Sequence, residues 1–197
     1  MSNEPTRREA AAAGHTGDVA TARRALDSGD PAVRATGLGA LARLGALADG
    51  DVATALRDHS AAVRRRAAEV AARRPEADLL PLLHDDDPMV VEVAAWAVGE
   101  HESDSDEIVG RLVELAGLDD DPLVRESAVA ALGAIGADAG RTAILAALDD
   151  KPAVRRRAVL ALAPYEGADV DAAIEKALHD RDWQVRQAAE DLRRAMR

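Results

Sequence analysis

The chain has 197 residues, a formal net charge of −11 and no cysteine. The lack of cysteine excludes disulfides and thiolate metal sites, and no apolar run is long enough to predict a membrane span. The acidic balance disfavours nucleic acid as a partner, because phosphate binding needs a basic surface. The first residues lack the apolar core of a signal peptide, so we expect a cytoplasmic protein.

The composition favours helices. Hydrophobic residues make up 48% of the chain, yet there is no Phe, one Tyr and two Trp, so the apolar content is mostly Ala, Leu and Val. Ala and Leu are strong helix formers, and small side chains let helices approach closely. No strand-like alternation of useful length appears, so the sequence predicts an all-α fold.

Six stretches of the chain repeat the same pattern of a short first helix, a turn and a second helix. Their aligned valines, which begin the core face of each second helix, are Val33, Val63, Val90, Val124, Val154 and Val185. A period of about 30 residues is typical of a solenoid, in which each repeat contacts only its neighbours. We predict one right-handed α-solenoid over residues 18–197, preceded by an N-terminal half repeat over residues 1–17.

The predicted repeat units follow one another along the chain at 18–47, 48–75, 76–103, 104–137, 138–167 and 168–197. Their first helices are expected at 18–26, 51–57, 77–84, 106–118, 138–148 and 169–179. Asp before Pro predicts N-caps at Asp30, Asp87 and Asp121; Ser60 and Asp182 occupy the same place, where Lys151 cannot cap. Left-handed C-caps are expected at Gly45, Gly136 and Gly167.

The motif DPxVRxxAxxAL is clearest in "DDDPLVRESAVAALGAIG", residues 119–136. It resembles the HEAT-repeat superfamily, and specifically the short bacterial and archaeal phycobilin-lyase-like repeats. The resemblance covers residues 18–197 and implies a helical-pair solenoid. Lyases, DNA glycosylases and a di-iron hydroxylase share such repeats, but the repeat does not carry their activities with it.

The resemblance also implies a ladder in which the Arg after each valine pairs with an acid in an inter-helix turn. The arginines are Arg34, Arg64, Arg125, Arg155 and Arg186, and the turn acids are Asp58, Asp85, Asp119, Asp149 and Asp180. The third unit carries Val91 in place of the arginine, so one rung of the ladder should be missing.

The third unit also suggests a binding face. At 100° per residue, positions two, six and nine after the valine point away from the core, and in HEAT-like arrays that side of the second helices is concave. Trp96 takes the sixth position, with Glu92 and Glu100 one turn away and Glu69 and Glu126 in the neighbouring units. An aromatic ring among carboxylates suits a basic ligand; the alternative is that Trp96 only packs against adjacent helices.

The charge distribution supports a basic ligand. Residues 76–126 hold 16 Asp and Glu against two Arg, a net of −14, between flanks of +3 and zero. The sequence therefore predicts a non-enzymatic scaffold for a basic peptide or protein surface. A lyase-like enzyme or enzyme subunit is the first alternative, and a HEAT-like DNA-binding or repair module is the second.

Nothing in the sequence predicts a catalytic residue, a metal site or a cofactor. The chain has one His-Glu pair, His101-Glu102, and one pair cannot enclose a dinuclear metal site. The histidines are scattered, at His15, His59, His84, His101 and His179. No Gly-x-Ser-x-Gly motif and no glycine-rich phosphate loop occurs. The oligomeric state does not follow from these patterns.

Overall fold

The computed structural model of the protein describes residues 4–196, and over these residues it holds twelve α-helices, three short 3-10 helices and no strand. The predicted all-α class is confirmed. The backbone forms two compact units, Met1–Ala97 and Val98–Arg197, whose boundary lies inside helix α6. No helix among residues 4–196 is long and apolar enough to cross a membrane.

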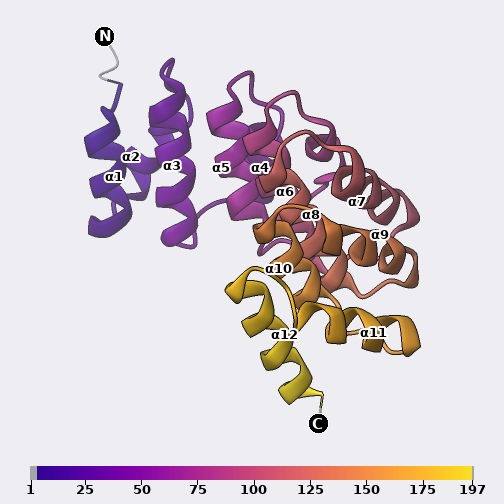
Figure 1. The fold of residues 1–197 in the computed structure, drawn as a ribbon. Helices are drawn as coiled ribbons and strands as arrows, with labels where there is room; N and C mark the ends of the chain where they lie inside the picture. Colours follow the sequence, from indigo (N-terminus) through magenta and orange to yellow (C-terminus); the bar gives the residue numbers. More distant parts are fainter. Residues whose placement is uncertain (1–3, 197) are drawn as a thin grey trace. The chain divides into compact units, whose positions relative to one another are not determined.

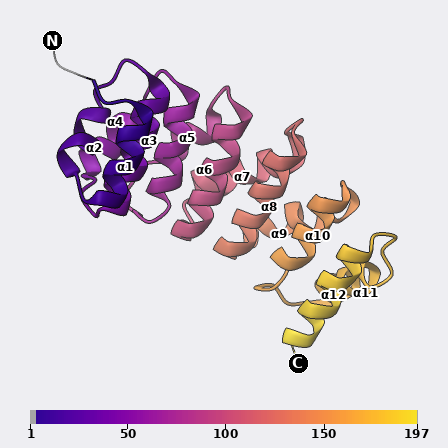
Figure 2. The same cartoon turned by 90° about the vertical axis from the view of Figure 1, so that its left-hand side faces the viewer.

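The first unit is built from two layers of helices (Figures 1 and 2). Its elements are α1 (Arg7–Thr16), α2 (Val19–Ala25), α3 (Pro31–Arg43), α4 (Asp49–Ala55), α5 (Ala61–Ala71), the 3-10 helix η1 (Leu80–His84) and α6 (Pro88–His101) as far as the unit boundary. Helices α1, α3 and α5 pack in sequence, while α2 packs on α3 and α4 on α5. Because α1 packs directly on α3, it stands where the second helix of a preceding repeat would stand.

The second unit repeats the arrangement, with α8, α10 and α12 in one row and α7, α9 and α11 in the other (Figure 1). Its elements after α6 are α7 (Asp106–Leu118), α8 (Pro122–Ile135), η2 (Asp138–Gly140), α9 (Arg141–Ala146), η3 (Ala147–Asp149), α10 (Pro152–Ala161), α11 (Ala168–Ala177) and α12 (Trp183–Ala195). In both rows of second helices, small buried residues bring the backbones close together.

Most predicted helix caps form, and two do not. Aspartate carboxylates accept a backbone N–H in the first turn of second helices at Asp30, Asp87, Asp121 and Asp182. Ser60 makes no such side-chain bond. Gly45 and Gly136 are left-handed, with φ of 66° and 69°. The prediction for Gly167 is wrong: α10 ends earlier, and Gly167, with φ 129°, immediately precedes α11.

The layer of first helices is irregular in the third repeat. An α-helix predicted over 77–84 is replaced by the single 3-10 stretch η1 (Leu80–His84), whose second residue is Pro81. Proline has no N–H to donate to a helical hydrogen bond, and the preceding residues 72–79 form only turns, a bend and irregular chain. The layer of first helices therefore has no full helix beside α4 in the third repeat, and this leaves space for a hollow there.

Arginine ladder and candidate binding face

Four arginines of the second helices each clamp an aspartate in the turn of the following repeat. The pairs are Arg34–Asp58, Arg64–Asp85, Arg125–Asp150 and Arg155–Asp180, in which Nε and Nη2 meet both carboxylate oxygens at 2.6–2.9 Å. The remaining Nη1 donates to a backbone carbonyl in the turn before the arginine's own helix, at 2.8–2.9 Å. Each arginine thus joins two consecutive turns.

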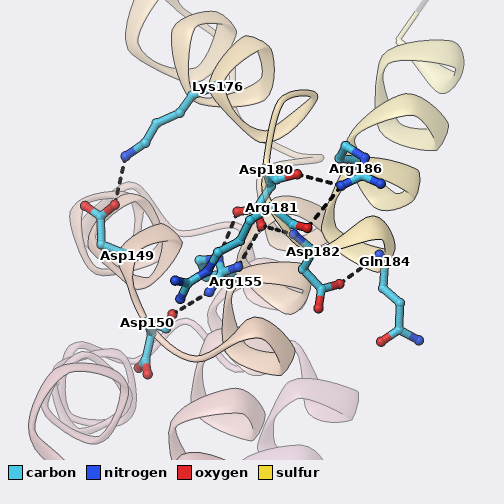
Figure 3. Close-up of polar contacts among 9 residues, drawn as sticks. All are labelled: Asp149, Asp150, Arg155, Lys176, Asp180, Arg181, Asp182, Gln184 and Arg186. Carbon is cyan, nitrogen blue, oxygen red and sulfur yellow. Dashed lines mark hydrogen bonds and ion pairs between the residues drawn. The ribbon is translucent and has the colours of Figure 1, made fainter.

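Arg155 shows this geometry with the least solvent contact (Figure 3). Its side chain is 5% exposed, its Nε and Nη2 hold Asp180, and its Nη1 donates to the carbonyl oxygen of Asp150. Arg186 repeats only the second part, donating from Nη1 to the carbonyl oxygens of Asp180 and Arg181 at 2.7 and 3.2 Å. Bidentate Arg–carboxylate pairs are stronger than hydrogen bonds between neutral groups, because two well-directed hydrogen bonds act together with the attraction between opposite charges.

The structure pairs the carboxylates of Asp58, Asp85 and Asp180 with ladder arginines, but not those of Asp149 and Asp119. The acid that pairs with Arg125 is Asp150, because the turn leading to the fifth second helix is one residue shorter than the others. Asp149 instead meets Lys176 in an exposed ion pair at 2.8 Å (Figure 3).

The carboxylate of Asp119 accepts the N–H of Asp121, and its carbonyl oxygen accepts Nη1 of Arg125. Asp119 therefore holds the turn of its own repeat. Val91, which stands in the arginine position of the third repeat, is 4% exposed and offers no side-chain donor.

The ladder lowers the pKa of four carboxyl groups. Hydrogen bonds from the arginines hold the pKa of Asp58, Asp85, Asp150 and Asp180 below its ordinary value, against the opposing effect of burial. A carboxyl group with a lower pKa in the folded chain than in the unfolded chain favours folding at any pH above its unfolded pKa.

This linkage predicts acid sensitivity. The stabilisation should be fully present above the unfolded aspartate pKa of about 4 and be lost as the pH falls below it. We expect the free energy of unfolding in urea to decline below about pH 4, with a shallower decline in Asp180→Asn, which has one titrating ladder carboxyl fewer. An unfolding free energy that is the same at pH 3 and pH 6 would contradict this.

The candidate binding face is the side of the second helices that was predicted to carry Trp96, Glu92, Glu100, Glu69 and Glu126. Trp96 is its prominent side chain in the first unit. It is 44% exposed on α6, although its helix neighbours Ala95 and Ala97 are fully buried. Glu92 precedes it by one helical turn and is half-buried. The equivalent residue of the preceding repeat, Glu69, is bound by Arg66 Nη1 at 2.5 Å and lies 3.9 Å from Arg65 Nε.

The face of the second unit carries the same mixture of charges. Glu126 Oε1 lies 3.8 Å from Arg156 Nη2 and 3.5 Å from Arg157 Nη2, and Glu100 is exposed near the end of α6. Glu69 and Glu126 are therefore partnered by arginines of the runs 64–66 and 155–157. The acids and arginines of this face partly neutralise one another.

No group of three or more His, Asp or Glu that could hold a metal ion occurs in the part of the chain that the structure describes. The five histidines lie on or next to different elements, and all but His101 are exposed.

Comparison of the sequence with protein families identifies the family of the repeats. The HEAT-repeat family matches three overlapping stretches, residues 51–133, 76–163 and 112–192, which together span well over half of the chain. The chain belongs to the HEAT-repeat family. Among curated proteins, none matches this HEAT-repeat chain in sequence.

Solved structures share the fold. A designed armadillo repeat protein in complex with the peptide (KR)4 is 20% identical, with a TM-score of 0.61 over 99% of this chain and 96% of its own. A computationally designed armadillo repeat protein for modular peptide recognition is 20% identical, with a TM-score of 0.58 over 98% and 95%. At this identity the likeness shows that the HEAT-repeat chain folds as an α-solenoid.

Proposed function

We propose that this HEAT-repeat protein is a non-enzymatic scaffold that binds a basic peptide or protein surface on its second-helix layer, with Trp96 as the anchor. The observation that carries the proposal is the exposure of Trp96 at a position where the other repeats place smaller side chains: Gly39, Glu69, Ala130, Leu160 and Asp191. We also propose that the repeats are of the phycobilin-lyase-like type.

The chemistry of the third repeat supports a basic ligand. An indole ring offers a large apolar surface and a π face that attracts guanidinium and ammonium groups. Aromatic anchors are enriched among the residues that dominate binding energy at interfaces. Glu92 adds a carboxylate one turn away on the same helix, and residues 76–126 carry a net charge of −14, from 16 acids and two Arg.

The fold supports a peptide as the form of that ligand. The designed armadillo repeat protein similar in structure was solved with (KR)4, a peptide of alternating lysine and arginine. A solenoid offers a long surface of parallel helices on which an extended chain can lie. Because Glu69 and Glu126 are paired with arginines, we assign the leading role to Trp96.

A binding experiment with a matched tryptophan control tests the proposal. We expect fluorescein-labelled (KR)4 to bind the wild-type protein in fluorescence anisotropy, and Trp96→Ala to weaken binding by about tenfold or more. Trp183, 65% exposed at the start of α12, serves as control, and Trp183→Ala should bind as the wild type does. Circular dichroism verifies that both variants fold.

Two outcomes would reject the proposal: no binding of (KR)4 at low salt, or equal affinities of the wild type and folded Trp96→Ala. Equal losses in both tryptophan variants would also reject Trp96 as a specific anchor. A labelled peptide of alternating Gly and Ser, which lacks charge, should not bind.

A further inference from the structure

A hollow of about 640 Å³ lies beside α4 in the first unit. One wall is a face of α4 and the residues that follow it, and the other is the segment from Arg73 to Leu82. The hollow exists because the third repeat has only the 3-10 stretch η1 where a full first helix would cover α4. It lies among the first helices, in a different layer from the one that presents Trp96.

The floor of the hollow is apolar. Val52, Leu56 and Leu82 contribute largely buried side chains, and Ala53 and Pro81 are exposed at the surface of the hollow. Pockets that bind small molecules typically have volumes of about 300–1,000 Å³ and combine an apolar lining with a few polar groups. The hollow therefore has the size and lining of a small-molecule site.

Some of the charged residues around the hollow are already engaged within the protein. The guanidinium of Arg74 binds Asp49 from Nε at 3.2 Å and the carbonyl oxygen of Leu47 from Nη2 at 2.8 Å. The carboxylate of Asp78 accepts the N–H of Leu80 at 3.2 Å. These contacts leave Arg74, Asp49 and Asp78 with partners of their own.

Two of the cationic groups at the hollow have hydrogen-bond donors left. Among the described residues, the Arg57 side chain makes one hydrogen bond, from Nη1 to the carbonyl oxygen of Ala53 at 3.2 Å. Arg73 and Glu76 are exposed, and within residues 4–196 neither side chain has a hydrogen bond or an ion pair. Two guanidinium groups with donors to spare thus line the hollow together with the carboxylates of Glu76 and Asp78.

We propose that this hollow binds a small amphipathic anion, with its apolar body on Val52, Leu56 and Leu82 and its carboxylate at Arg73 and Arg57. A guanidinium pairs with a carboxylate through charge-assisted hydrogen bonds, while burial of the apolar body supplies the non-directional part of the affinity. The site is independent of peptide binding at Trp96, so either proposal can fail without the other.

Two amphiphiles with the same chain length and opposite charge test the proposal. Decanoate and decyltrimethylammonium are titrated into the ¹⁵N-labelled protein at pH 7. We expect decanoate to shift the backbone amide signals of Gly50, Ala53 and Ala77, and to bind about tenfold or more tightly than the cation. Equal affinities would overturn the anionic class, and the absence of shifts at these amides would overturn the site.

Two substitutions separate the apolar and charged contributions. Ala53→Trp fills the hollow from an exposed helix position without creating a cavity, and should abolish the decanoate shifts. Arg73→Gln should weaken decanoate about tenfold while leaving decyltrimethylammonium unchanged. Arg8→Gln, at an exposed arginine of α1, and Trp96→Ala should bind decanoate as the wild type does. Wild-type affinity in folded Ala53→Trp would overturn the site.

Discussion

Arg155→Ala is expected to lower the free energy of unfolding by about 3 kcal/mol. The substitution removes the guanidinium that holds Asp180 and the carbonyl oxygen of Asp150. It leaves the carboxylate of Asp180, 16% exposed, without its cationic partner and with only the N–H of Asp182 as a donor among the described residues. Removal of one member of a largely buried pair costs more than the pair contributes, because the remaining charge stays desolvated. Urea unfolding at pH 7, followed by circular dichroism, measures the loss.

A neighbouring exposed ion pair provides the control. Lys176 and Asp149 meet at 2.8 Å with side chains 68% and 76% exposed, and exposed pairs of this kind contribute about 0–1 kcal/mol. Lys176→Ala should therefore unfold close to the wild type. Equal effects of Lys176→Ala and Arg155→Ala would show that the ladder does not join the repeats energetically.

Gly133→Ala is expected to destabilise the protein by about 1–3 kcal/mol, since overpacking displaces backbone as well as side chains. A Cβ atom at Gly133 in α8 would lie 2.5 Å from Cβ and 2.6 Å from Cα of Ala161 in α10. The methyl group cannot be accommodated by a side-chain rotation, because the atoms that it meets are a backbone carbon and a Cβ. The two helices would have to move apart.

Gly110→Ala is the matched control, at an exposed position inside α7 with no atom within 4 Å of the added Cβ. There alanine should stabilise by about 0.5–1 kcal/mol, because glycine is the poorer helix former. Thermal and urea unfolding of both variants compare the two positions. A Gly133→Ala protein as stable as Gly110→Ala would mean that α8 and α10 are not in close contact.

The second helices could be predicted well from the sequence because their signals are local. An Asp-Pro cap and an apolar face at helical spacing need no knowledge of the rest of the chain. Which turn residue becomes the ladder acid is a less local property, because it depends on where the preceding first helix ends. Counting back from Val154 predicts Asp149. Counting forward by three residues from Ala147, the buried residue of η3 directly after α9, reaches Asp150, just as counting from Ala177 at the end of α11 reaches Asp180.

The first-helix layer and the charges of the binding face were harder to predict. Apolar residues over 77–84 match a helix pattern, but Pro81 limits the segment to 3-10 geometry. The partners of Glu69 and Glu126 depend on which way long arginine side chains extend, and this is decided by tertiary contacts. One signal was available: the arginine runs 64–66 and 155–157 place cations beside both acids.

The indole signals of the two tryptophans test the central claim most directly. In a ¹H–¹⁵N spectrum the chain gives two indole resonances, from Trp96 and Trp183, and Trp183→Phe assigns them. On titration with (KR)4, we expect the Trp96 indole signal to shift and saturate with the binding measured by anisotropy, while the Trp183 signal stays in place. A Trp96 signal that does not move while the peptide is bound would contradict the account.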